Sequence, residues 1–247
     1  MKAFASDFDG TIYFVKNDQK MKTEDVEAIR AFQNKGNLFG VCTGRSLHGI
    51  VKAKGLEADF DFFILANGAR ILDKNLNEIH RKTIERDVLI KTYETMTDFG
   101  VGDIVIHANK TVYTFGKGLP LQIHIESFDE IEGDNIFGIS TFAGYDKAHE
   151  LADKINRDFE GKLIAYVNKS IVDVVSYGSS KGNAVKFIKD YLNIDEIAGI
   201  GDSFNDVPMF DAADVSFTFE SSHEDVKEKA DYIVETAADA IRIFEEK

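Results

Sequence analysis

The stretch that decides the fold is Asp7-Phe8-Asp9-Gly10-Thr11, which ends an apolar run that predicts a strand over residues 3–8. Residues two apart on a strand point the same way, so Asp7 and Asp9 leave the end of this strand toward one spot. Two carboxylates there repel each other unless a cation or a shared proton relieves them. Gly10 permits a tight turn, which the Thr11 hydroxyl can fix. A simple Asp/Gly turn is the alternative interpretation, because this pattern is also common turn chemistry.

Apolar runs alternate with amphipathic helical stretches on both sides of this motif. Thr23-Glu24-Asp25 predicts the start of a helix that stops at Gly36, and apolar runs at 38–42 and 60–65 predict two more strands. The last third continues with helices over 181–192, 206–213, 224–229 and 237–246 and strands over 197–201 and 215–219. Nearly unbroken apolar strands between helices indicate an α/β fold, in which helices cover both faces of a parallel sheet.

The middle of the chain has a different pattern. It predicts helices over 86–99 and 147–159, a hairpin over 104–108 and 112–115, a strand over 136–142, and paired strands over 163–167 and 171–175. This is an α+β pattern inside an α/β frame. We therefore predict a core built from residues 1–81 and 177–247, interrupted by an inserted domain over 82–176.

A second acidic motif, Gly201-Asp202-Ser203-Phe204-Asn205-Asp206, follows another buried apolar run. Ligands bind along the carboxyl edge of open α/β sheets. Carboxylates brought there from separate strands form an oxygen-rich site suited to Mg²⁺. The alternative is an acidic helix start capped by Ser203 or Asn205. A dinucleotide site is weakly indicated, because Phe204 stands where the third glycine of that fingerprint belongs.

Two more polar groups stand at matching places. Thr43-Gly44-Arg45 follows the second strand, where a hydroxyl and the N–H groups of the next helix start could hold a phosphate. Lys181 begins a helix, where a cation opposes the helix dipole unless something else uses the charge. An exposed lysine is the alternative interpretation, and no P-loop sequence surrounds it.

Composition limits the classes of function. The 247 residues carry 29 Lys+Arg against 43 Asp+Glu, a formal charge of −14, which disfavours nucleic acid or an anionic membrane as a partner. The single cysteine, Cys42, excludes an intramolecular disulfide, and its apolar surroundings predict a small buried side chain. With no signal peptide and no membrane-length apolar run, we expect a cytoplasmic protein.

Taken in order, the four motifs resemble those of the haloacid dehalogenase (HAD) superfamily, and most closely its Cof-type phosphatase branch. The resemblance implies a Rossmann-like, HAD-like core. Thr11 and Thr43 are too close in sequence for a domain between them, whereas Thr43 and Lys181 are 138 residues apart. The insertion at 82–176 therefore matches the family's C2-type cap, which covers the site and selects the substrate.

By resemblance, this is a phosphatase, a phosphoric monoester hydrolase that works through an aspartyl-phosphate. Asp7 would be the nucleophile, Asp9 the acid and then the base, and Lys181 would stabilise the transition-state charge. Mg²⁺ would be held by Asp7, the Asp9 backbone carbonyl, Asp202 and Asp206. The phosphoryl oxygens would be bound by Thr43, Gly44, Lys181 and Asn205.

The expected substrate is a small phosphorylated metabolite, such as a sugar phosphate or a phosphorylated cofactor. Asp9 favours phosphoryl transfer over dehalogenation, because the dehalogenases of this superfamily lack this acid. A phosphomutase or phosphotransferase on the same core stays open, as does a non-catalytic phosphate-binding regulator, although a regulator would be expected to lack Asp7, Asp9 or Lys181. The natural substrate and the oligomeric state stay open as well.

Overall fold

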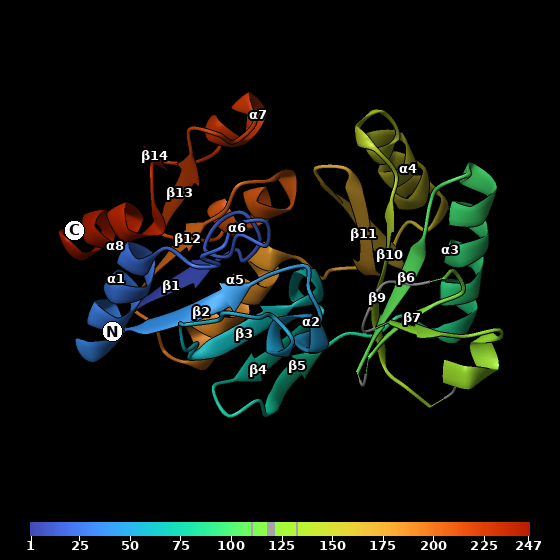
Figure 1. Cartoon of the computed structure of the whole chain (residues 1–247), viewed down its shortest axis with the longest axis horizontal. Helices are drawn as coiled ribbons and strands as arrows, with labels where there is room; N and C mark the ends of the chain where they lie inside the picture. Colours follow the sequence, from blue (N-terminus) through green and yellow to red (C-terminus); the bar gives the residue numbers. More distant parts are fainter. Residues whose placement is uncertain (110, 118–121, 132) are drawn as a thin grey trace.

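The structure, a computed structural model, describes residues 1–109, 111–117, 122–131 and 133–247. It contains two β-sheets (Figure 1). The eight-stranded core sheet has the order β14-β13-β12-β1-β2-β3-β4-β5, and the six-stranded second sheet has the order β10-β11-β9-β6-β7-β8. The chain leaves the core after β5 and returns to it before α5, and both termini lie on the core.

The core sheet is parallel from β14 to β3, and β4 and β5 extend it in antiparallel pairing. Its strands are β1 (Lys2–Ser6), β2 (Leu38–Cys42), β3 (Phe62–Leu65), β4 (Arg70–Asp73), β5 (Glu78–Arg81), β12 (Glu196–Ile200), β13 (Val215–Phe219) and β14 (Tyr232–Val234). Its helices are α1 (Thr23–Asn34), α2 (Leu47–Val51), α5 (Lys181–Tyr191), α6 (Val207–Phe210), α7 (Glu224–Lys227) and α8 (Ala237–Glu245). Short 3₁₀ turns, η1 (Ala66–Gly68) and η3 (Phe204–Asp206), follow β3 and β12.

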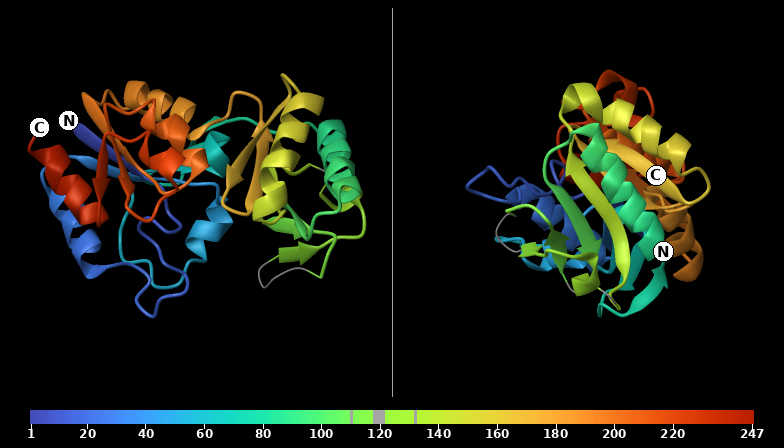
Figure 2. Two further views of the ribbon diagram at one scale, coloured as in Figure 1. Left: turned by 90° about the horizontal axis from the view of Figure 1, so that it is seen from above. Right: turned by 90° about the vertical axis from the view of Figure 1, so that its right-hand side faces the viewer.

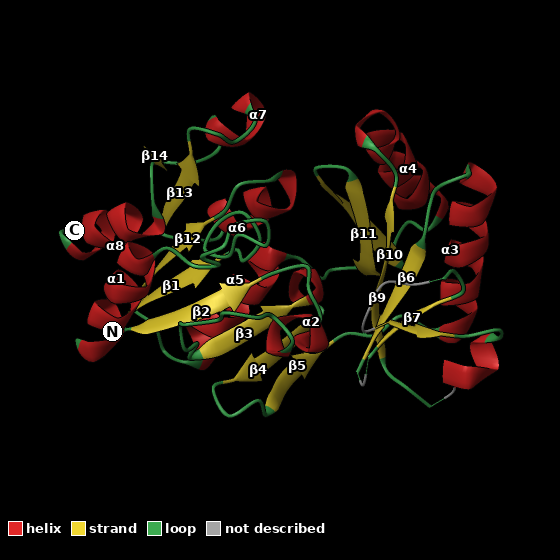
Figure 3. Cartoon of the chain, in the orientation of Figure 1, coloured by secondary structure: helices red, strands yellow, loops and turns green. Residues whose placement is uncertain are grey.

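Helices cover both faces of the core sheet, as the apolar strands predict (Figure 3). The strand alternation of β1 divides its side chains between these faces: Phe4 packs with α1 and α8, whereas Ala3 and Ala5 pack with α5 and α6. The Phe4 ring stacks on Phe39 and Phe217, with centroids 5.7 and 5.9 Å apart. This interlocked core fixes β1 in the middle of the sheet, and with it the residues that follow β1.

Among the residues that the structure describes, the second sheet has helices on one face only. It comprises β6 (Ile104–Ala108), β7 (Val112–Thr114), β8 (Gln122–His124), β9 (Ile136–Phe142), β10 (Leu163–Asn168) and β11 (Ile171–Ser176), with α3 (Arg86–Phe99), α4 (Tyr145–Asp158) and the short turn η2 (Phe128–Ile131). Figure 2 shows α3 and α4 on the side of the sheet away from the core. The bare face of the sheet therefore points toward the core. We propose that this unit is the cap and keep the domain limits at 81/82 and 176/177.

Most predicted elements form within a residue or two of their predicted limits. The first strand ends at Ser6 rather than at residue 8, because the backbone turns at the acidic motif, and Gly10 has a φ of +85°. Two three-residue strands, β8 and β14, were not predicted, because three residues are too short to show a period. The helix predicted over 206–213 is a 3₁₀ turn followed by α6, which has Pro208 in its first turn.

Two smaller predictions have clear outcomes. The prediction that Cys42 is buried is confirmed, since its side chain is fully inaccessible in β2. Among the described residues, no helix is both long enough and apolar enough to cross a membrane. Localisation in the cytoplasm stays a prediction.

Candidate active site

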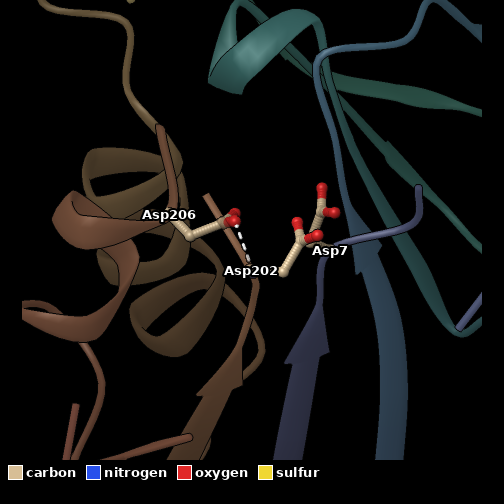
Figure 4. A group of neighbouring side chains, drawn as sticks. All are labelled: Asp7, Asp202 and Asp206. Carbon is tan, nitrogen blue, oxygen red and sulfur yellow. Dashed lines mark hydrogen bonds between the residues drawn. The ribbon is translucent and has the colours of Figure 1, made fainter. Parts of the chain in front are cut away.

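Two of the predicted carboxylates meet because β1 and β12 are parallel neighbours. Ser6 lies opposite Ile200, so Asp7 and Asp202 follow the ends of adjacent strands at one edge of the sheet. Asp206 reaches the same place from η3. One carboxylate oxygen from each of Asp7, Asp202 and Asp206 lies within 4.8 Å of the others, and Figure 4 shows the three side chains pointing toward one another. The prediction that the two motifs converge is thus confirmed in geometry.

Lys181 lies inside this cluster. Its Nζ donates to Asp7 Oδ1 at 2.6 Å and to Asp206 Oδ1 at 2.5 Å, and its side chain is fully buried. Gly182, the next residue, explains why Lys181 is buried so deeply. A Cβ on Gly182 would lie 2.0 Å from the Pro208 carbonyl oxygen. Only glycine allows α5 to approach α6 this closely. The alternative of an exposed Lys181 is therefore wrong.

Asp206 organises the loop as well as binding the lysine. Its Oδ2 accepts hydrogen bonds from the backbone N–H groups of Asp202 and Ser203, each at 3.0 Å, and η3 begins with a capping box. Burial raises the pKa of Asp206 above its ordinary value, whereas Lys181 lowers it. Because one ammonium and two N–H groups bind the carboxylate, we assign the ionised form at neutral pH. The interpretation as an acidic helix start is therefore correct for Asp206, and this role coexists with the site.

Asp9 is not a member of the carboxylate cluster, and its side chain pairs with Arg45. The guanidinium donates to both oxygens of Asp9, from Nε and Nη2, at 2.6 Å each. Its carbon lies over the rings of Phe8 and Tyr13, at 5.0 and 5.4 Å. Burial raises the pKa of Asp9, and the hydrogen bonds and charge of Arg45 oppose the rise. The motif around Arg45 does not predict this pairing with Asp9, which the structure shows.

The remaining predicted residues lie close by. The buried Thr43 hydroxyl accepts a hydrogen bond from the Arg45 N–H at 3.1 Å, and Gly44 follows it. Asn205 is buried, and its Nδ2 donates to Oδ1 of Asn67 at 3.1 Å. Asn67 leads from β3 into the antiparallel β4. Its φ of +49° and its contact with Asn205 show that it also belongs to the site.

The second sheet supplies side chains that sequence reasoning missed. Lys169, in the β10–β11 turn, donates from Nζ to Asp202 Oδ2 at 2.7 Å. Asp173 of β11 accepts a hydrogen bond from Asn67 Nδ2 at 3.3 Å. The only sequence signal was a carboxylate between Val172 and Val174 in an otherwise apolar strand. Such a residue is costly to bury, so it marks a site of special use.

Core and cap together line a half-open cavity of about 840 Å³. Asp7, Asp9 and Arg45 border it from the core, and His107, Ser140, Asp173 and Lys169 are among the residues that border it from the cap. A small molecule bound there would touch the carboxylates on one side and the cap sheet on the other. The arrangement suits a reaction at Asp7 in which the cap contacts the rest of the molecule.

The donor set of the cluster fits a hard divalent cation. Three carboxylates within 4.8 Å of one another offer only oxygen atoms, which Mg²⁺ prefers. In this structure, the ammonium groups of Lys181 and Lys169 pair with the three carboxylates and offset two of their three negative charges. Asp9 is not part of the cluster, so its side-chain carboxylate is not one of the candidate cation ligands.

Comparison with known proteins gives a consistent result. A family model described as haloacid dehalogenase-like hydrolase matches residues 4–241. The chain is 27% identical to the 5-amino-6-(5-phospho-D-ribitylamino)uracil phosphatase YwtE of Bacillus subtilis, covering 96% of this chain and 93% of that protein. It is 25% identical to a phosphoglycolate phosphatase of Sulfurisphaera tokodaii, covering 93% and 86%. The structure of a haloacid dehalogenase-like hydrolase from B. subtilis superposes with a TM-score of 0.84 at 23% identity, covering 99% of both chains.

Proposed function

Because this chain belongs to the haloacid dehalogenase-like hydrolases, we propose that it is a Mg²⁺-dependent phosphatase that hydrolyses phosphate monoesters of small metabolites, with Asp7 as the nucleophile. The sequence prediction of this family, and of an enzyme within it, is confirmed by the family match and by relatives named as phosphatases. The roles of individual residues, the metal and the substrate are the substance of the proposal.

The observation that carries the proposal is the position of Lys181 between Asp7 and Asp206. A buried ammonium 2.6 Å from the Asp7 carboxylate stabilises negative charge at the place where a phosphoryl group would be attacked. A carboxylate needs no base to act as a nucleophile. An ion pair that served only stability would not need to place Lys181 between Asp7 and Asp206 at the carboxyl edge of the sheet.

The reaction would proceed in two displacements. A carboxylate oxygen of Asp7 attacks phosphorus, the bond from phosphorus to the alcohol oxygen breaks, and Asp9 gives a proton to that oxygen. Asp9 then takes a proton from water, which attacks the aspartyl-phosphate, releases phosphate and restores Asp7. The raised pKa of Asp9 supports this role, because the residue must be protonated in the first step.

The neighbouring groups would bind and orient the substrate. Asp7, Asp202 and Asp206, with the backbone carbonyl of Asp9, would hold Mg²⁺, which when bound neutralises charge on the phosphoryl oxygens. Thr43 and Gly44 would bind these oxygens through the hydroxyl and backbone N–H groups. Asn205 would contribute its side chain, which Asn67 holds in place.

The expected activity can be tested directly. We expect the purified protein to release phosphate from p-nitrophenyl phosphate with Mg²⁺ and to stop when EDTA is added. Asp7→Asn keeps the size of the side chain but removes the nucleophile, so its activity should fall by several orders of magnitude. Full activity of that variant, or turnover in EDTA, would refute the mechanism. Release of phosphate to water, rather than its transfer to another position of the sugar, separates a phosphatase from a mutase.

A further inference from the structure

Asp173 occupies an unusual position on the cap. It lies in the middle of β11, directly opposite Ser140 of β9, and both face the cavity. Ser140 hydrogen-bonds Asp173, and Nε2 of His107 on β6 contacts the Ser140 hydroxyl. The three side chains therefore form a polar line across three neighbouring strands, on the face that has no helix. The opposite face carries apolar residues such as Ile139 and Val174, which pack in the cap core.

The same carboxylate touches the phosphate-binding part of the core. A Cβ on Gly44 would lie 2.9 Å from Asp173 Oδ2, so the carboxylate rests against the loop that follows β2. The Asn67 Nδ2 group donates a hydrogen bond to the same Oδ2 atom at 3.3 Å. A carboxylate can accept about four hydrogen bonds. Asn67 and Ser140 supply two, which leaves capacity for a ligand in the cavity.

The charges that line the cavity limit what can be bound there. Among the lining residues that the structure describes, the positive side chains are Arg45 and Lys169, and both pair with carboxylates of the core, Asp9 and Asp202. Burial lowers the pKa of His107 to about 4, so it is neutral. Beside Asp173, the cap wall therefore presents hydroxyl, imidazole and carboxylate groups. This wall favours a hydroxylated molecule over one with a second anionic group.

We propose that Asp173 is a specificity-determining residue that accepts a hydrogen bond from a hydroxyl of the leaving alcohol, which selects polyhydroxylated phosphate esters and rejects esters that carry a second anion. The proposal rests on the proposed phosphatase function. Burial raises the pKa of Asp173 to about 6, with the Asn67 and Ser140 hydrogen bonds opposing the rise. The group is thus ionised, and able to accept from a hydroxyl, above that pH.

Three substrates and two variants test the role of Asp173. Wild type, Asp173→Asn and Asp173→Ala are assayed with Mg²⁺ on ribose-5-phosphate, 2-phosphoglycolate and p-nitrophenyl phosphate. For ribose-5-phosphate, we expect kcat/KM to fall about 10- to 100-fold, mainly through KM, the size of one hydrogen bond to a charged group. For 2-phosphoglycolate, it should rise, because the repulsion of a second anion is removed. For the aryl phosphate, it should change little, because the ester carries no hydroxyl beside Asp173.

The pattern of activity changes over the three substrates distinguishes substrate recognition by Asp173 from a purely structural role in holding the cap. Asp158→Asn is the matched control, because Asp158 is a cap carboxylate that pairs with Lys154 on α4 and does not border the cavity. Equal losses on all three substrates would show that Asp173 only docks the cap, and unchanged kinetics would show that it has no role; either result overturns the proposal. A wild-type protein that hydrolyses none of the three would instead refute the phosphatase function, and this proposal with it.

Discussion

Removing Lys181 should cost stability as well as activity. Lys181→Met keeps the length of the side chain but leaves the Asp7 and Asp206 carboxylates without the ammonium that lies 2.6 and 2.5 Å away. Lys181 and Asp206 are fully buried. Breaking a buried ion pair on one side costs about 3–5 kcal/mol, because the remaining charge has lost its partner. For a chain of this size, that corresponds to a fall in melting temperature of about 6–20 °C.

The loss should depend on pH and on metal. Burial already raises the pKa of Asp206, and removal of Lys181 raises it further, so the folded variant binds protons more readily than the unfolded chain. The deficit relative to wild type should therefore shrink as the pH falls through the pKa of Asp206 in the folded variant. Mg²⁺ should raise the melting temperature more in the variant than in wild type, because it replaces the missing positive charge.

Thermal unfolding followed by circular dichroism, in EDTA and in saturating Mg²⁺, measures both effects. Lys186→Met is the matched control, since Lys186 is an exposed lysine on the same helix. If Lys181→Met melts at the temperature of wild type in EDTA, the ion pairs do not carry the energy assigned to them. If Mg²⁺ stabilises both proteins equally, the metal and the lysine do not share the same carboxylates.

Two further changes test the packing around the site. Burial lowers the pKa of His107 from the ordinary 6.5 to about 4, so the unfolding free energy should fall by at most about 3 kcal/mol as the pH drops from about 6.5 to 4. Urea unfolding at a series of pH values measures this dependence. His107→Asn should remove this part of the pH dependence, and the control His124→Asn, at an exposed histidine, should keep it. Gly182→Ala should lower the unfolding free energy by about 1–3 kcal/mol and reduce phosphatase turnover, because the new Cβ would overlap the Pro208 carbonyl. The control Gly49→Ala, whose Cβ would lie 3.5 Å from the nearest atom, should leave the unfolding free energy and the turnover unchanged. Equal effects of the two substitutions would contradict the packing argument.

The core and most of the site follow from local patterns in the sequence. Apolar runs identified the strands that carry Asp7 and Asp202, and parallel pairing is enough to bring their ends together. The same reasoning could not place Lys181, because a lysine at a helix start is locally unfavourable. What reverses that preference is the proximity of Asp7, 174 residues earlier in the chain, and of Asp206.

The cap contributions were not predictable for a different reason. Lys169 and Asp173 reach the core only because the bare face of the cap sheet is turned toward it, and no periodicity encodes the orientation of one domain on another. Arg45 was visible in its motif, yet its bidentate contact with Asp9 depends on how the turn after β1 folds. Contacts between side chains that are far apart in the sequence therefore cannot be predicted from local sequence patterns.

The order of strands in the core sheet has a consequence for the chain during its synthesis. One neighbour of the central strand β1 is β2, which emerges from the ribosome early, but the other is β12, nearly 200 residues later. Until then, β1 has an unpaired edge, which can pair with another chain. Every strand pair of the cap lies within one continuous segment, so we expect the cap to fold while the core still waits. The nascent chain thus completes its inserted domain first, and β1 keeps an unpaired edge until β12 is made.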